Sequence, residues 1–458
     1  MQHRLESANP RWSSRASFHL AAIGASVGLG SVWRFPYLTG TYGGSAFVLV
    51  FILACFAVAT PLLAAEFLIG RKARSSPPLC AGLVAAEVGS SPAWNIIGVL
   101  GTLAAFLITS YYTVIAGWVL AYTWKCASGE LTGLGRSTVP EQFRIFLSSP
   151  VRVGAWHLAF LILVAAISAR GIHKGIERVN AVRAPALLIL LLILVVYALI
   201  TGDVARGLTF AFAPDWSKFS ANLVLAALGQ SFFATGVGMA MMIAYGAYVP
   251  SGTSLVTSAV AISVSIVTVS LLATLMIFPL VYRYGLNPAQ GIDLVFNVFP
   301  IMFAEMRGGR LIGSAFFLLL VFAALTPSIA ALEAVVVWLQ RWRKVSRVTA
   351  VASASIAVWL FGLGSVLSFN VGAHWHPLAA IPRFATMNFF EIVDFVSTNL
   401  LLPVGALLTC ILVGWRLPIR IIKDSTPEEP PIRRWLWIRL LQFICPAAII
   451  ALLIAATV

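Results

Sequence analysis

Three glycines interrupt an apolar segment near the start of the chain, in the run Gly24-Ala25-Ser26-Val27-Gly28-Leu29-Gly30-Ser31. Glycine in the interior of a helix costs about 1 kcal/mol relative to alanine, so this run predicts a helix that is broken near its centre. A second run has the same character, Gly229-Gln230-Ser231-Phe232-Phe233-Ala234-Thr235-Gly236-Val237-Gly238. We expect a second broken helix there.

The composition places both runs in a membrane protein. Of the 458 residues, 60% are hydrophobic and only 10% are charged, whereas charged residues make up about a quarter of a soluble protein. This balance excludes a disordered chain and most cytosolic enzymes. Lipid offers the backbone no hydrogen-bond partners, so a long continuous apolar segment must form a helix. We therefore predict an all-α integral membrane protein.

Eleven apolar segments are candidates to span a bilayer, which takes about 20 residues of helix. They cover residues 15–38, 45–70, 94–124, 153–169, 179–201, 217–246, 254–282, 311–340, 348–368, 389–414 and 434–457. The loops between them are short and leave no room for a soluble domain. The two interrupted runs fall in the first and the sixth segment.

Most Lys and Arg residues fall in the N-terminal segment and in the loops after segments two, four, eight and ten. Arg178 and Arg183 are assigned here to the loop after segment four. Cytoplasmic loops carry such an excess of positive charge. The pattern predicts a cytoplasmic N-terminus, a C-terminus outside the cell and a multi-pass protein of the cell inner membrane. Topology thus accounts for the net charge of +15, and we expect no nucleic-acid partner.

Interrupted membrane helices have a chemical consequence. Backbone groups that the break frees must line a polar cavity, because lipid does not tolerate them. The N-terminal end of a half-helix attracts an anion and free carbonyls attract a cation, which suits the two charges of an amino acid. Close packing of helices through small residues is the simpler alternative. Two interruptions, in the first and sixth segments, favour a transporter binding site.

The chain resembles the neurotransmitter:sodium symporter family over nearly its whole length. The resemblance rests on Gly28-Leu29-Gly30-Ser31-Val32-Trp33-Arg34-Phe35-Pro36, Gly43-Gly44-Ser45-Ala46-Phe47, Tyr111-Tyr112, Gly229-Gln230-Ser231-Phe232-Phe233, Tyr245-Gly246-Ala247-Tyr248 and Asn399-Leu400-Leu401-Leu402-Pro403. It implies a LeuT-type fold of eleven helices in which helices 1 and 6 are broken. It also implies a single transporter domain over residues 1–458, with two inverted five-helix repeats (15–201 and 217–414) and one extra helix (434–457).

The same resemblance implies secondary active transport of an amino acid. Gly28 stands where monoamine carriers of the family have an aspartate, and glycine there leaves room for the carboxylate of the substrate. The small Gly236 and Ala331 favour an apolar side chain of some size. The implied ligands are, for the carboxylate, Leu29, Gly30 and Tyr112; for the amine, Ser26, Phe233 and Ala234; and for the side chain, Ile108, Phe233, Gly236, Met239 and Ala331.

An extracellular gate above this site is also implied. Arg34 and Asp394 would form its ion pair, Gln230 would lie beside Arg34, and Phe233 would be its aromatic lid. An arginine–carboxylate pair is strengthened by charge, but at this position it stays solvated enough to open.

The departures from the family pattern concentrate at the ions. The first sodium site of the family aligns to Ser31, Ala234 and Ile266, which offer one hydroxyl between them. A hard cation needs several oxygen ligands. We therefore expect this site to be absent or badly weakened.

The second sodium site is half preserved. Its implied ligands are the carbonyls of Gly24, Val27 and Ala323 and the hydroxyl of Thr326. Pro327 replaces the usual second hydroxyl and contributes no N–H either. We favour sodium-coupled symport through this single degenerate site. Proton-coupled transport, ion-independent transport and a transport-dead sensor on the same fold stay as alternatives.

Glu66 is the candidate proton carrier, because an ionisable group inside a membrane is a functional candidate by default. A structural carboxylate that binds freed backbone groups explains it equally well. The cytoplasmic gate of the family aligns to Asn9 and Arg341, so its identity here is open. The chain has no P-loop and no nucleophile elbow, and we expect neither an enzyme nor a bound cofactor. The expected partners are an amino acid and the bilayer, with the oligomeric state open.

Overall fold

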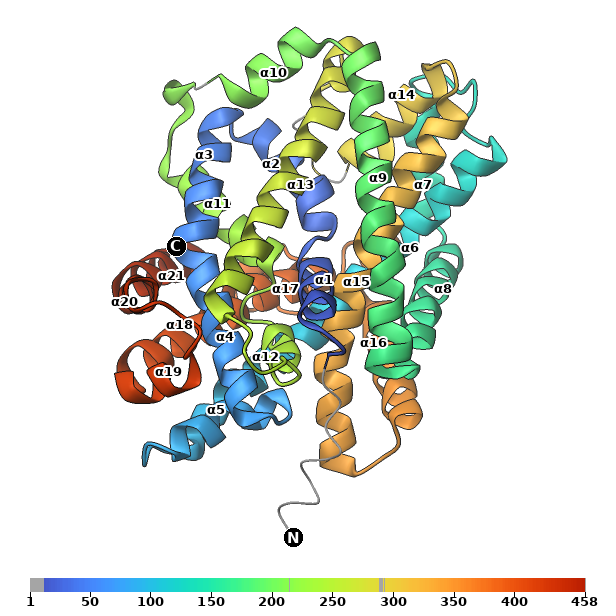
Figure 1. The fold of residues 1–458 in the computed structure, drawn as a ribbon. Helices are drawn as coiled ribbons and strands as arrows, with labels where there is room; N and C mark the ends of the chain where they lie inside the picture. Colours follow the sequence, from blue (N-terminus) through green and yellow to red (C-terminus); the bar gives the residue numbers. More distant parts are fainter. Residues whose placement is uncertain (1–11, 214, 288–290, 292, 458) are drawn as a thin grey trace.

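The computed structural model describes residues 12–213, 215–287, 291 and 293–457, and all regular structure in that part is helical (Figure 1). Nine helices there are long and apolar enough to cross a membrane, and a bent pair makes a tenth. The pair is α1 (Arg15–Ser26) with Gly30–Thr41 (η3, α2), and the others are Ser45–Ala73 (α3, η4, α4), Pro92–Ser128 (η5, α6), Pro150–Ala169 (α8), Ile172–Thr201 (η6, α9), Leu255–Arg283 (α13), Gly309–Arg343 (α15), Arg347–Leu367 (α16), Phe389–Arg416 (α17, η10, α18, η11) and Pro431–Ala456 (α20, η12, α21).

Shorter helices connect these spans. They are α5 (Pro77–Ala86), α7 (Thr138–Leu147), α10 (Val204–Phe212), α11 (Ala221–Thr235), α12 (Met241–Gly246), α14 (Phe299–Glu305) and α19 (Ile419–Ser425). The all-α membrane fold predicted from composition is confirmed. Ten of the eleven predicted segments correspond to the nine long helices and the bent pair. The sixth segment, 217–246, contains the two short helices α11 and α12.

The first break falls inside the glycine run near the N-terminus. α1 begins after Ser14, whose hydroxyl accepts a hydrogen bond from the N–H of Ser17, and it ends at Ser26. Val27 is extended (φ −78°, ψ 93°), and helical structure resumes at Gly30 after a bend of 51°. The predicted break in the first helix is confirmed.

The second break separates α11 from α12. α11 ends at Thr235. Gly236 follows with a φ of +68°, in the left-handed region, and Gly238 has a φ of +84°. Glycine adopts this conformation at no steric cost, and a helix cannot continue through it. The predicted break in the sixth helix is therefore confirmed. Neither half alone is long enough to count as a span, so helix length in the described part does not by itself yield eleven spans.

Burial differs strongly between the helices. In α15, 78% of the most apolar 18-residue stretch is buried, against 22% in the last span, Pro431–Ala456. Apolar side chains of that last span, such as Ile450 and Ile454, are exposed, as expected of a surface that lipid covers. Figure 1 shows α1 near the middle of the molecule, between α13 and α15. The division into two inverted repeats and an extra helix stays a prediction.

Candidate substrate and ion sites

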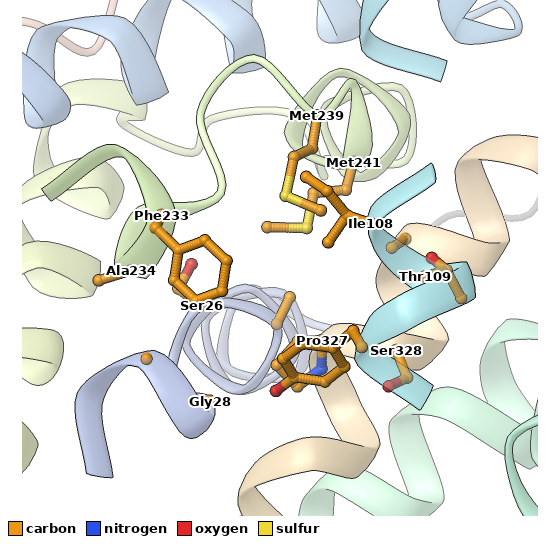
Figure 2. Close-up of a pocket in the computed structure, with 14 residues that line it drawn as sticks. Ser26, Gly28, Ile108, Thr109, Phe233, Ala234, Met239, Met241, Pro327 and Ser328 are labelled. Atoms are coloured by element: carbon orange, nitrogen blue, oxygen red, sulfur yellow. The ribbon is translucent and has the colours of Figure 1, made fainter. Parts of the chain in front are cut away.

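A pocket lies between the two helix breaks. Figure 2 shows Met239, from the loop between α11 and α12, and Met241, the first residue of α12, on one side of it, and Gly28 and Pro327 on the opposite side. The walls come from both breaks, α6 (Ile96–Ser128) and α15. The lining residues are Ala25, Ser26, Gly28, Gly30, Ile108, Thr109, Tyr112, Phe233, Ala234, Met239, Met241, Pro327, Ser328 and Ala331.

Most of the substrate residues predicted from the resemblance come together here. Those that line the pocket are Ser26, Gly30, Ile108, Tyr112, Phe233, Ala234, Met239 and Ala331. Leu29 does not line it but donates its N–H to the Tyr112 hydroxyl at 3.2 Å. Gly236 lies behind Met241, whose Cε occupies the place where a side chain on residue 236 would begin. Their roles as substrate ligands stay predictions.

Six further lining residues are not among the predicted substrate ligands. Ala25, Gly28 and Pro327 occupy positions that the sequence analysis discusses, whereas Thr109, Met241 and Ser328 do not. Thr109 follows the predicted Ile108, and Ser328 follows the ion-site position Pro327. Met241 belongs to the methionines just after the second glycine run. Adjacency in sequence was the signal that could have found all three.

One end of the pocket is suited to a carboxylate. Tyr112 is buried there, and its hydroxyl accepts the hydrogen bond from Leu29. A Cβ atom added to Gly28 would lie 3.2 Å from that hydroxyl and 2.7 Å from Cγ of Pro327. Glycine at this position therefore keeps the approach to the hydroxyl clear of a side chain.

The ends of two half-helices approach the pocket from the other direction. α1 ends at Ser26, whose hydroxyl donates to the carbonyl of Thr235 at the end of α11 (3.3 Å). The last carbonyls of a helix have no partner within it, and this end of the helix dipole carries a partial negative charge. Two such ends at one place attract a cationic group such as an amine.

Phe233 separates the pocket from a second cavity. That cavity is lined by Arg34, Tyr37, Tyr111 and Asp394, among others, and it shares Gly30, Tyr112 and Phe233 with the pocket. The guanidinium of Arg34 lies over the Phe233 ring, 4.5 Å from its centre.

The other predicted gate residues lie near this ring. Arg34 and Asp394 line one cavity but form no ion pair within 4.0 Å, although both belong to the described residues. Gln230 donates its side-chain N–H to the carbonyl of Gly30 at 2.7 Å and so ties α11 to the first break. The gate roles stay predictions, and in this conformation the Arg34–Asp394 pair is not formed.

Trp12, just before α1, makes contacts that the sequence analysis does not predict. The indole N–H of Trp12 donates to the carbonyl of Tyr245 at 3.3 Å, and its backbone N–H donates to the carbonyl of Tyr248. Nearby, Arg347 forms a two-pronged ion pair with the buried Glu333 (2.6 and 3.0 Å).

Of the two positions aligned with the family's cytoplasmic gate, one belongs to the described residues. Arg341 donates to the hydroxyl of Ser75 at 2.9 Å. Asn9 lies outside the described residues.

The first ion position offers little to a cation. Ala234 and Ile266 are buried and apolar, and the buried hydroxyl of Ser31 has no hydrogen-bond partner among the described residues. One hydroxyl is a poor site for a hard cation. The absence or weakening of this sodium site stays a prediction.

The second ion position has its predicted oxygen atoms and one unpredicted neighbour. The Thr326 hydroxyl is buried and has no partner in the described part. Pro327 lies inside α15 and has no N–H, so the carbonyl of Ala323 loses its helical partner. However, α9 (Arg178–Thr201) brings Arg183 to this place. Arg183 is buried within a helix, so counting it with a cytoplasmic loop was wrong.

Glu66, in α4 (Thr60–Ala73), is buried beside the second break. One of its carboxylate oxygens accepts a hydrogen bond from the N–H of Gly238 at 2.7 Å, and the other has no partner among the described residues. The contact with Gly238 matches the structural alternative kept in the sequence analysis. The unpartnered oxygen leaves the predicted proton role available.

Comparisons with known proteins agree with this geometry. The sequence model of the Sodium:neurotransmitter symporter family matches residues 9–134 and 148–458. YhdH of Bacillus subtilis, described as an uncharacterized sodium-dependent transporter, is 35% identical over 451 residues and 96% of each chain. An uncharacterized sodium-dependent transporter of Haemophilus influenzae is 31% identical over 456 residues and 97% of each chain. A crystal structure of MhsT in complex with L-phenylalanine superposes with a TM-score of 0.89 at 36% identity, over 98% of this chain and 99% of that chain.

These matches include both helix breaks and the pocket between them. They confirm the LeuT-type fold that the sequence motifs implied, and they identify a multi-pass membrane transporter rather than an enzyme. The chain belongs to the sodium:neurotransmitter symporter family.

Proposed function

We propose that this protein carries a neutral amino acid with an apolar side chain across the membrane by alternating access. The pocket between the two breaks carries the proposal. One end presents the Tyr112 hydroxyl beside the N–H of Leu29, and the other presents the carbonyl ends of two half-helices. The walls between them are mostly apolar. Such a pocket complements a zwitterion with a hydrophobic side chain.

The walls support a side chain as large as that of phenylalanine. Met239 and Met241 face the pocket with flexible thioethers, which adapt to aromatic rings, and Ala331 is small. The similar transporter MhsT has been crystallised with L-phenylalanine. L-Phenylalanine is therefore the first probe to use.

The two sides of the pocket differ in the way that alternating access requires. On one side the Phe233 ring, beneath Arg34, lies between the pocket and a second cavity. On the other side Trp12 and the Glu333–Arg347 pair hold the helices together. Transport then consists of closing the Arg34–Asp394 side and releasing the Trp12 side.

The membrane orientation is also a proposal. The excess of Lys and Arg in alternate loops supports a cytoplasmic N-terminus and an outer C-terminus in the cell inner membrane. The second cavity then faces outward, and Trp12 lies at the cytoplasmic side.

Two observations bear on the driving ion and point in opposite directions. The names of two relatives describe them as sodium-dependent, which supports the sodium coupling that the sequence favoured. The contacts of Arg183 at the second ion position support the alternative, transport without sodium there. Glu66→Gln tests the proton alternative: glutamine still accepts from Gly238 but carries no proton. Under proton coupling, the variant is expected to lose uptake driven by a proton gradient and to keep exchange of substrate across the membrane.

The proposed function is tested with purified protein in proteoliposomes. Labelled L-phenylalanine is offered against a panel of unlabelled amino acids, first for binding and then for counterflow into vesicles preloaded with substrate. Binding with counterflow is expected, and apolar members of the panel should compete best. Binding without counterflow would instead indicate the transport-dead sensor, and failure of every panel member to bind would defeat the amino-acid proposal.

A further inference from the structure

A buried positive charge lies next to the second ion position of this chain. Arg183 is only 4% exposed, and its Nη1 donates to the carbonyl of Phe322 in α15 at 2.7 Å. A Cβ atom added to Gly24 of α1 would lie 2.7 Å from Nη2 of Arg183 and 3.1 Å from Cγ2 of Thr326. The guanidinium therefore lies between α1 and α15, beside Gly24 and in the neighbourhood of Thr326, two of the four residues predicted to bind sodium.

This charge is not neutralised by an acid. Among the described residues Arg183 forms no ion pair, and its Nε has no hydrogen-bond partner. The buried Asn180 lies beside it: its Oδ1 would also be 2.7 Å from a Cβ atom on Gly24, and it too has no partner in the described part. A buried charge is costly unless polar groups compensate it.

Besides the Phe322 carbonyl, carbonyl groups without helical partners lie in the same neighbourhood as Arg183. The last turn of α1 ends at Ser26 and leaves carbonyls without helical partners, at the negative end of the helix dipole. Pro327 frees the carbonyl of Ala323 in the same region. An arginine placed here receives from the protein the electrostatic environment predicted for sodium.

We propose that Arg183 is a tethered cation that takes the place of sodium at the second ion position. Arginine stays charged at every physiological pH, and as part of α9 it cannot leave with the substrate. A sodium ion beside it would be repelled strongly in this water-poor site. The first position, with Ser31, Ala234 and Ile266, offers no replacement site. Substrate binding and transport by this protein therefore need no sodium.

Direct measurement of sodium binding tests the proposal without any substrate. Purified wild-type protein is titrated with radioactive sodium in a scintillation proximity assay, with choline as the competing background cation. The expected result is no saturable binding to the wild type or to Arg183→Lys, and saturable binding to Arg183→Ala, in which the position is vacant. Saturable binding of sodium by the wild type would overturn the proposal.

A matched control separates this site from a general effect of charge. Arg178 lies on the same helix but is exposed, so Arg178→Ala should bind no more sodium than the wild type. Melting temperatures provide a second readout, because a ligand that binds only the folded protein raises its stability. Sodium chloride in place of choline chloride should raise the melting temperature of Arg183→Ala only. If Arg183→Ala does not fold, the wild type and Arg183→Lys still test the proposal. A melting temperature that rises with sodium in either protein contradicts it.

The Arg183 proposal rests on the proposed function only in its statement about substrate binding and transport. Measuring L-phenylalanine binding in choline chloride and in sodium chloride distinguishes failure of the Arg183 proposal from failure of the amino-acid proposal. Loss of binding in both salts defeats the amino-acid proposal and leaves the sodium titration intact. Binding that requires sodium defeats the Arg183 proposal alone. In Arg183→Ala, sodium should tighten L-phenylalanine binding about tenfold, a typical coupling between two sites.

Discussion

The substrate pocket and the two ion positions share the first helix break, but their side chains differ in how far they keep the family pattern. Gly28, Tyr112 and Phe233 all line the pocket, as the proposed amino-acid site requires. Ala234 belongs to both regions: its carbonyl is a predicted amine ligand, whereas its methyl group cannot bind sodium. Recognition that uses the backbone survives such a replacement, and recognition that uses a side-chain oxygen does not.

The largest expected effect comes from giving the pocket a carboxylate of its own. Gly28→Asp would place a side chain 2.7 Å from Pro327 and 3.2 Å from the Tyr112 hydroxyl, where the substrate carboxylate is proposed to lie. Steric overlap and like charge together should weaken L-phenylalanine binding more than about 100-fold. Equilibrium binding to purified protein measures this.

Gly229→Ala is the matched control for that variant. Gly229 is a glycine of the second run, and a Cβ atom there meets nothing within 4 Å. Its L-phenylalanine affinity should equal that of the wild type. Equal losses in both variants would show that the pocket is not the substrate site.

The next largest effect concerns the carboxylate end of the pocket. Tyr112→Phe removes one hydroxyl, and a hydrogen bond to a charged group contributes about 1.5–3 kcal/mol. L-Phenylalanine affinity should fall roughly 10- to 100-fold while the melting temperature changes little. Tyr122→Phe, on the same helix with an unpartnered hydroxyl, should leave the affinity unchanged. An unaltered affinity in Tyr112→Phe would refute the carboxylate assignment.

A smaller effect is expected at the lid. Phe233→Leu keeps an apolar wall but removes the ring beneath Arg34. A cation–π contact is worth about 1 kcal/mol, so L-phenylalanine should dissociate about fivefold faster in stopped-flow measurements. Phe232→Leu is the control, because its buried side chain does not line the pocket. An equal increase of the L-phenylalanine dissociation rate in both variants would show that Phe233 is not part of the gate.

The smallest expected effect concerns the preference for L-phenylalanine over L-leucine. Met241→Leu keeps the volume of the wall but loses the contact of sulfur with an aromatic ring, worth about 0.3–1.5 kcal/mol. L-Phenylalanine affinity should fall about two- to threefold, and L-leucine affinity should stay unchanged. Competition binding with both amino acids measures the ratio, and an equal loss for both would show that Met241 does not contact the ring.

Sequence reasoning reached the features that depend on local composition. The glycine runs predicted both breaks, and continuous apolar stretches located the spans. Sequence reasoning did not predict contacts between segments that are distant in the chain. Charge counting placed Arg183 in a loop, because nothing local shows that α9 carries this residue against Gly24. The contacts of Trp12 with Tyr245 and Tyr248 were hidden for the same reason. Gly236 was assigned to the pocket by analogy, but its left-handed backbone and the Met241 side chain place it behind the wall.

The central claim is that the substrate site is intact while the ion positions have been replaced. The most direct measurement is the affinity of the wild-type protein for L-phenylalanine in sodium chloride and in choline chloride at equal ionic strength. Saturable binding is predicted in both salts, with dissociation constants that agree within about twofold, because an ion that does not bind cannot shift the equilibrium. Binding that appears only in sodium chloride, or in neither salt, would contradict the account.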